Sequence, residues 1–167
     1  MITVSDSGPL IHLAQVNQFN LLKRFFAKIV IPQIVYQEVV SEGKGRFGAQ
    51  ELKEALNAGW IITDKLQGIL TVKALSGENL SHKDMLVVAF ALEKSADLFL
   101  SDDLQVRSIA KEKGLNIVGT LGILTRAKQN SLIPSLKNIL DKLINHGFHL
   151  DPKGNVYKAA LKKVREL

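Results

Sequence analysis

The stretch from Ser81 to Asp103 constrains the fold most, because a buried helix and a buried strand follow one another there over a short connection. Residues 85–92 are apolar nearly all round, which predicts a helix covered on most sides. In residues 97–100, bulky apolar residues follow Asp97, which is typical of a strand covered on both faces in a parallel sheet. Acidic residues stand at both ends of this unit.

The rest of the chain repeats the alternation of short strands and helices. We predict the further strands over residues 2–4, 28–31, 60–63 and 116–118. We predict the further helices over residues 10–16, 20–26, 49–57, 104–113 and 121–128, with one more helix beginning at Pro32. Residues 69–75 fit a strand or a loop. The pattern predicts a three-layer α/β/α fold with a mostly parallel central sheet and right-handed crossovers.

The chain changes character from Ile133 onward. Residues 134–145 and 153–166 have the pattern of two helices, with no further strand after them. We therefore expect a single domain over residues 1–167, in which residues 132–167 form a C-terminal helical extension. A chain of 167 residues with 46% hydrophobic residues is large enough for one sizeable core.

The composition limits the classes of function. The absence of cysteine excludes disulfides, thiolate metal sites and a cysteine nucleophile. No apolar run approaches the roughly 20 residues that span a bilayer, and the N-terminus does not begin as a leader peptide does, so we expect a cytoplasmic protein with no membrane partner. A formal net charge of +6 favours a polyanionic partner such as nucleic acid.

Acidic residues are expected to meet at one edge of the sheet. Asp6, Asp102 and Asp103 follow strands, while Glu38 and Asp84 lie on helices. Ligands of open parallel sheets bind outside the carboxyl ends of the strands. Carboxylates that lie close together repel one another unless a cation neutralises them. Mg²⁺ or Mn²⁺ accepts such oxygen ligands, and a site of this kind supports phosphodiester hydrolysis by metal-activated water.

Several segments together carry a resemblance to a known family. They are TVSDSGPLIHLA, IPQIVYQEVV, HKDMLVVAFALEKSADLFLSDD, the R-x-x-A that follows, and GLNIVGT. In their order and spacing they resemble the PIN-domain family of metal-dependent ribonucleases, which includes the toxins of many prokaryotic toxin–antitoxin pairs. The resemblance covers about residues 1–130. The later segments GTLGILTRAKQN and NHGFHL resemble a PIN-like subgroup that is often encoded beside small partner proteins.

The resemblance implies a site, an activity and partners. It implies that Asp6, Glu38, Asp84 and Asp102 are catalytic residues that bind Mg²⁺ or Mn²⁺, with Asp103 as an auxiliary ligand. It implies endonucleolytic cleavage of single-stranded or structured RNA, with water as nucleophile and a 5′ phosphate as product. A small antitoxin protein and a second copy of the chain are the implied protein partners.

The third carboxylate has two candidates. In the PIN-like subgroup Gly-Glu commonly precedes the central helix, and Gly77-Glu78 matches that pattern. We favour Asp84 over Glu78, because its spacing to the strand-end aspartates is better. Asp84 also stands in an S-x-x-D relation to Ser81, which is typical of a helix cap.

The other acids have structural alternatives too. Asp6 begins a turn-like sequence, Asp102 and Asp103 precede a helix that either can cap, and Glu38 suits an exposed helix face. The rival function is therefore a non-catalytic PIN-like module that binds protein or nucleic acid. Intact acids at all four positions favour the enzyme.

Basic residues and histidines complete the candidates. Arg107, Arg126 and Lys128 are candidates for RNA binding, since charged donors contact phosphate at nucleic-acid surfaces. The alternative is an exposed helix face, which we prefer unless these positions converge near the acids. His146 and His149 have no evident partner residues, and we interpret them as structural.

Overall fold

The computed structural model describes all residues from 1 to 167 and contains one five-stranded sheet. The sheet order is β3-β2-β1-β4-β5, and every strand pair is parallel. The strands are β1 (Thr3–Ser5), β2 (Ile29–Pro32), β3 (Ile61–Asp64), β4 (Leu98–Leu100) and β5 (Ile117–Val118). The predicted three-layer α/β/α class is confirmed, with an all-parallel sheet.

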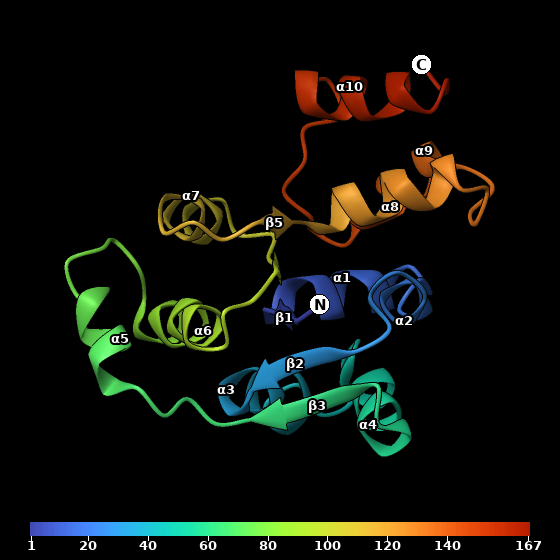
Figure 1. The fold of residues 1–167 in the computed structure, drawn as a ribbon. Helices are drawn as coiled ribbons and strands as arrows, with labels where there is room; N and C mark the ends of the chain where they lie inside the picture. Colours follow the sequence, from blue (N-terminus) through green and yellow to red (C-terminus); the bar gives the residue numbers. More distant parts are fainter.

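Helices connect each strand to the next (Figure 1). Between β1 and β2 lie α1 (Ser7–Gln15) and α2 (Asn20–Phe26), and between β2 and β3 lie α3 (Gln33–Tyr36), the π-helix η1 (Gln37–Ser41) and α4 (Ala49–Ala58). Between β3 and β4 lie α5 (Ile69–Ala74) and α6 (His82–Glu93), and α7 (Leu104–Glu112) joins β4 to β5. In the sheet, β2 and β3 therefore lie on one side of β1, and the later strands β4 and β5 lie on its other side.

The central helix and strand behave as the apolar pattern predicts. Residues 87–91 of α6 are completely buried, and so are Phe99 and Leu100 of β4. They belong to one contiguous core of 40 buried residues. In the sheet, Ser5 of β1 is in register with Leu100 of β4, so the two strands end side by side. The residues that follow these strands are therefore neighbours at the carboxyl edge of the sheet.

The C-terminal helices share this core. They are α8 (Thr120–Gln129), α9 (Leu136–Asn145) and α10 (Asn155–Lys163), and Figure 1 shows them grouped on one side of the molecule. Both α9 and α10 pack on α8. Leu136, Leu140 and Leu143 of α9 are completely buried within the common core.

No helix of the structure has the length and apolar character that crossing a membrane requires.

The main difference from the sequence-based expectation lies in residues 69–75, which form neither a strand nor a loop. They contain the helix α5 (Ile69–Ala74), which packs on α6 and buries none of its own residues. Its β-branched, apolar sequence resembles a strand locally. Contacts with α6 therefore set its conformation more than local preference does.

Candidate active site

A cavity of about 730 Å³ opens at the carboxyl edge of the sheet. Four acids line it, namely Asp6, Asp84, Asp102 and Asp103. We call it the acidic cavity. Its position follows from the register of β1 and β4, and it matches the place where open parallel sheets bind ligands.

Asp6 is the most buried acid of the cavity, with an exposed fraction of 5%. It is the N-cap of α1, and its Oδ1 accepts a hydrogen bond from the Ser7 backbone N–H at 2.8 Å. Its Oδ2 accepts one from Ser101 Oγ at 3.2 Å. Burial raises the pKa of Asp6, nearby carboxylates raise it further, and Lys83 and the Ser7 N–H oppose the rise. The expected turn-forming role and a place in the cavity therefore coexist.

Asp102 is held from two sides. Its Oδ1 accepts a hydrogen bond from the Thr120 backbone N–H at 2.6 Å, and its Oδ2 lies 2.5 Å from Thr120 Oγ1. The same Oδ2 lies 2.7 Å from His12 Nδ1. Asp102 thereby ties the end of β4 to the first residue of α8 and to α1.

The close approach of Gly119 explains why a glycine precedes α8. A Cβ at Gly119 would lie 2.7 Å from Arg107 Nη1 and 2.8 Å from Asp102 Oδ1. No side chain fits there without displacing the guanidinium or the carboxylate. The glycine thus preserves the position of Asp102.

Asp84 lies in the first turn of α6 with its carboxylate free of protein hydrogen bonds. Ser81 is the N-cap, and its Oγ accepts a hydrogen bond from the Asp84 backbone N–H at 3.1 Å. The capping bond therefore uses the amide of Asp84 and leaves its carboxylate available in the cavity. Asp103 is the N-cap of α7, and its Oδ1 accepts from the Val106 N–H at 2.9 Å.

Glu38 lies on η1, and Lys83 connects it to the acidic cavity. The Lys83 ammonium forms an ion pair with Glu38 Oε2 and lies 3.4 Å from Ser7 Oγ. Lys83 itself lines the acidic cavity, whereas Glu38 lines a neighbouring one. π-helical turns occur frequently at functional sites, and here the turn carries a candidate ligand.

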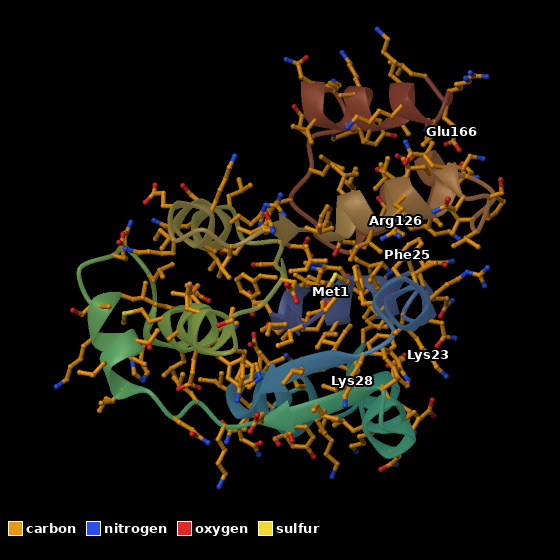
Figure 2. All side chains as sticks on the ribbon, in the orientation of Figure 1. Met1, Lys23, Phe25, Lys28, Arg126 and Glu166 are labelled. Carbon is orange, nitrogen blue, oxygen red and sulfur yellow. The ribbon has the colours of Figure 1, made fainter.

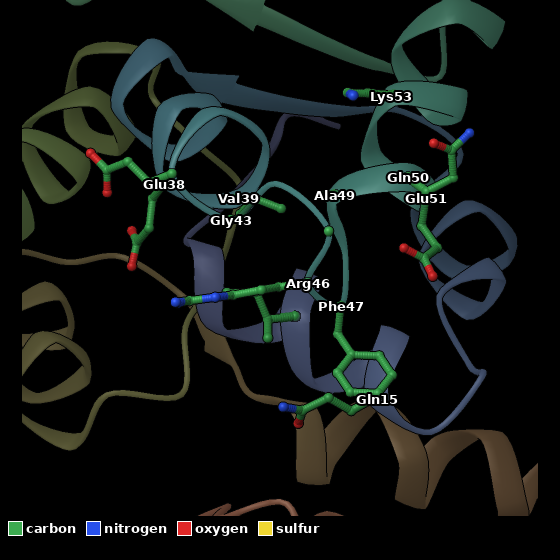
Figure 3. A pocket seen from close by; sticks show the side chains of 13 residues that line it. Gln15, Glu38, Val39, Gly43, Arg46, Phe47, Ala49, Gln50, Glu51 and Lys53 are labelled. Carbon is green, nitrogen blue, oxygen red and sulfur yellow. The ribbon is translucent and has the colours of Figure 1, made fainter.

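The neighbouring cavity has a volume of about 850 Å³ and is shown in Figure 3. The glycine-rich loop after η1 forms part of its wall, and the side chains of Phe47 and Gln15 lie at one end of it (Figure 3). Glu38 stands at the opposite end in this view. Glu38 thus sits between the two cavities.

The alternative ligand Glu78 lies elsewhere. Its Oε1 forms an ion pair with Lys113 Nζ at 3.1 Å, and it does not line the acidic cavity. The geometry therefore favours Asp84 over Glu78 as the third carboxylate.

The three basic candidates do not converge on the acids. Arg107 Nη1 donates to the Ser101 carbonyl at 2.9 Å. The Arg126 guanidinium lies 4.3 Å from the centre of the Phe25 ring, and Figure 2 shows the two side chains beside one another. Lys128 donates to the Pro134 carbonyl at 2.7 Å. None of the three lines the acidic cavity, and each contacts another part of the protein instead.

Sequence reasoning missed several groups of the cavity. His12 and Lys83 line it, and the segment after α9 contributes Phe148 and His149, although His149 had been interpreted as structural. The Phe148 ring packs edge-on against the His12 ring, with 4.9 Å between ring centres. The NHGFHL segment was the available signal, but its distance in sequence from the acids concealed the contact.

The donor chemistry of the cavity suits a hard divalent cation, since its acids offer oxygen ligands and the chain has no thiol. No three acidic or imidazole side chains are gathered closely enough here to hold one ion together. Mg²⁺ in proteins commonly takes only one or two carboxylates and completes its shell with water. The residues therefore fit a cation that is bound by few direct carboxylates.

Comparisons with known proteins identify the family of the chain. A family model described as a PIN domain (DUF3368) matches residues 2–166. Among solved structures, the chain is similar to a PilT N-terminus domain protein from the hyperthermophilic archaeon Sulfolobus solfataricus P2, with 17% identity and a TM-score of 0.48 over 90% of this chain and 100% of that chain. A search of curated proteins finds no match.

Proposed function

Because the chain belongs to the PIN-domain family, we propose that it is a metal-dependent endoribonuclease that cleaves single-stranded RNA. We further propose that it is the toxin of a toxin–antitoxin pair. One observation carries the enzymatic proposal: carboxylates from the end of β1, the end of β4 and the first turn of α6 line a single cavity. These are Asp6, Asp102 and Asp84.

The acids of the chain have different parts in holding Mg²⁺ or Mn²⁺. Asp6 and Asp102 are fixed by hydrogen bonds, whereas the carboxylate of Asp84 is free to adjust. Glu38 on η1 is connected to the cavity through its ion pair with Lys83, and Asp103 lines the cavity as an auxiliary group. The bound cation supplies Lewis acidity and lowers the pKa of a coordinated water.

The proposed reaction hydrolyses one phosphodiester bond of RNA. A water oxygen adds to phosphorus, the bond from phosphorus to the 3′ oxygen breaks, and the 3′ oxygen takes up a proton. The product carries a 5′ phosphate. The net charge of +6 supports an RNA substrate, because cationic proteins attract a polyanion before any specific contact forms.

We include a small antitoxin and a homodimer in the proposal. Leu104, at the first position of α7, is 81% exposed and lines the acidic cavity. A large exposed apolar side chain at the rim of a polar cavity suits contact with an inserted protein segment. This supports an antitoxin that covers the cavity.

The proposal is tested by incubating the purified chain with a labelled pool of single-stranded RNA, in Mn²⁺, in Mg²⁺ or in chelator. We expect cleavage with a divalent ion, none in chelator, and none by the double variant Asp6→Asn, Asp102→Asn. The variant keeps the two side-chain shapes, so a folded but inactive protein assigns the activity to the carboxylates. Metal-independent cleavage, or full activity of the variant, would refute the proposal.

The second candidate is a non-catalytic PIN-like module. One observation favours it, namely that no three potential ligands are gathered around one point in this structure. A folded protein that binds RNA or a protein partner without cutting RNA under any metal condition would establish the module.

A further inference from the structure

Lys83 is the one lysine or arginine side chain that lines the acidic cavity. It stands in the first turn of α6, directly before Asp84. Its ammonium reaches Glu38 on η1 and comes within 3.4 Å of Ser7 Oγ at the start of α1. One positive charge therefore links α6, η1 and the start of α1, which carry or adjoin three of the candidate ligands.

The Glu38 carboxylate depends on this lysine. Its Oε2 atom is buried and has no hydrogen-bonding partner apart from the Lys83 ammonium that pairs with it. A buried carboxylate oxygen without a cation is costly to the folded state. Loss of the Lys83 charge should therefore destabilise this position of the Glu38 side chain.

The acids near Lys83 also favour a positive charge at this position. Its ammonium pairs with Glu38, Lys83 directly precedes Asp84, and it lines the same cavity as Asp6. The ammonium therefore lies in the field of three acids that are candidate metal ligands. A divalent cation at these acids would meet the same carboxylates and repel the ammonium.

We propose that Lys83 is a built-in counter-ion that occupies the acid cluster in the metal-free protein and competes with the divalent cation for it. The inference rests on the proposed function, because it takes the acids as metal ligands. Lys83 is a positioning residue in this role: it keeps Glu38 and the start of α6 in place without metal, and it lowers the affinity of the site for metal. Binding of the cation then requires the ion pair with Glu38 to open.

The test compares Lys83→Met with the wild type and with Lys113→Met. Lys113 pairs with Glu78 outside the cavity, and the exposed fractions of that pair, 36% and 28%, match the 33% and 31% of Lys83 and Glu38. Mn²⁺ affinity is measured by titration calorimetry, and the melting temperature is measured in chelator and in Mn²⁺. We expect Lys83→Met to bind Mn²⁺ about tenfold more tightly or better, because one repelling charge is gone.

The melting temperatures give a second readout that does not depend on activity. In chelator, Lys83→Met should melt below the wild type, because Glu38 loses its only counter-charge. Mn²⁺ should then raise its melting temperature by more than it raises that of the wild type. Lys113→Met should match the wild type in its Mn²⁺ affinity and in its response to the metal.

Three results would overturn the inference. One is Mn²⁺ affinity of Lys83→Met equal to or weaker than that of the wild type. Another is a Lys83→Met variant that binds Mn²⁺ as tightly as the wild type does but no longer cleaves RNA, which would make Lys83 a contact for RNA. The third is an absence of Mn²⁺ binding in every protein, which would remove the proposed function as well. If the wild type cuts RNA with Mn²⁺ and Lys83→Met does not alter metal affinity, only the counter-ion role fails.

Lys83→Gln provides the same comparison should the methionine variant fail to fold, since the amide can donate to Glu38 without a charge. It should also bind Mn²⁺ more tightly than the wild type, and unchanged affinity would again overturn the inference.

Discussion

The acids of the acidic cavity differ in their burial and in their hydrogen bonds. Asp6 is buried and Asp102 is fully hydrogen-bonded, while Asp84 keeps its carboxylate free. Without a cation, the buried carboxylate of Asp6 is the one of the three whose charge destabilises the folded protein most. These differences lead to separate expectations for each acid.

Asp6→Asn should leave the fold intact, because asparagine is as good an N-cap as aspartate. Cleavage should fall by at least about 100-fold, since a ligand charge is lost. Without metal, the variant should gain stability relative to the wild type as pH rises. The pKa of Asp6 is raised in the folded state, so ionisation above that pKa disfavours folding.

Urea unfolding of both proteins in chelator, at several pH values from 4 to 8, measures this difference in the free energy of unfolding. A constant difference across that range would show that the burial of Asp6 does not alter its ionisation.

Asp84→Asn and Glu78→Gln form a matched pair that identifies the third carboxylate. Asp84 lines the cavity, whereas Glu78 pairs with Lys113 outside it. We expect a loss of cleavage of at least about tenfold for Asp84→Asn and near wild-type activity for Glu78→Gln. Rates of RNA cleavage at saturating Mn²⁺ measure both variants, and the reverse ranking would assign the role to Glu78.

At the scale of helices and strands, the sequence predicted the elements whose burial is evident from a local pattern of apolar residues. The apolar run of α6 and the short strand β4 were located correctly, as were the strand ends that carry Asp6 and Asp102. The helix α5 was missed, because its apolar, β-branched residues gain their helical form from packing on α6. Lys83 was missed as a cavity residue, because its role depends on which face of α6 meets η1.

The start of α9 depends on an acid from the far end of the chain. Glu166 accepts hydrogen bonds from the backbone N–H groups of Leu136 at 2.9 Å and Lys137 at 2.7 Å, and from Ser135 Oγ at 3.2 Å. Burial alone would raise the pKa of Glu166, but these donors and Lys128 lower it overall. Its stabilising contribution is therefore present above the unfolded pKa and is lost as pH falls through the lower folded pKa.

Glu166→Gln should reduce the free energy of unfolding by about 1 kcal/mol at pH 7, because the negative charge at the N-terminus of α9 is removed. The loss should shrink toward pH 3, because a growing fraction of the wild-type carboxyl is then protonated. Urea unfolding at both pH values measures it. The control is Glu112→Gln, since Glu112 is exposed on α7, and an equal loss in the control would remove the explanation.

At the scale of the whole molecule, the C-terminal extension belongs to the body that forms the site. Its helices share the core through Leu140 and Leu143, and the segment after α9 places Phe148 against His12 at the cavity. Sequence patterns identified these helices but not their contact with α1, because such a contact joins residues far apart in the chain. Asp6 and Asp102 were predictable from their positions after strands, while the partners that hold them were not.

The measurement that tests the central claim most directly is anomalous diffraction from crystals of the protein grown with Mn²⁺. We expect a manganese peak in the acidic cavity, bound by oxygens of Asp6, Asp84 or Asp102, with the Lys83 ammonium withdrawn from Glu38. Bound manganese elsewhere, or an empty cavity at saturating Mn²⁺ in a form that cleaves RNA, would contradict the assignment of this cavity as the metal-dependent active site.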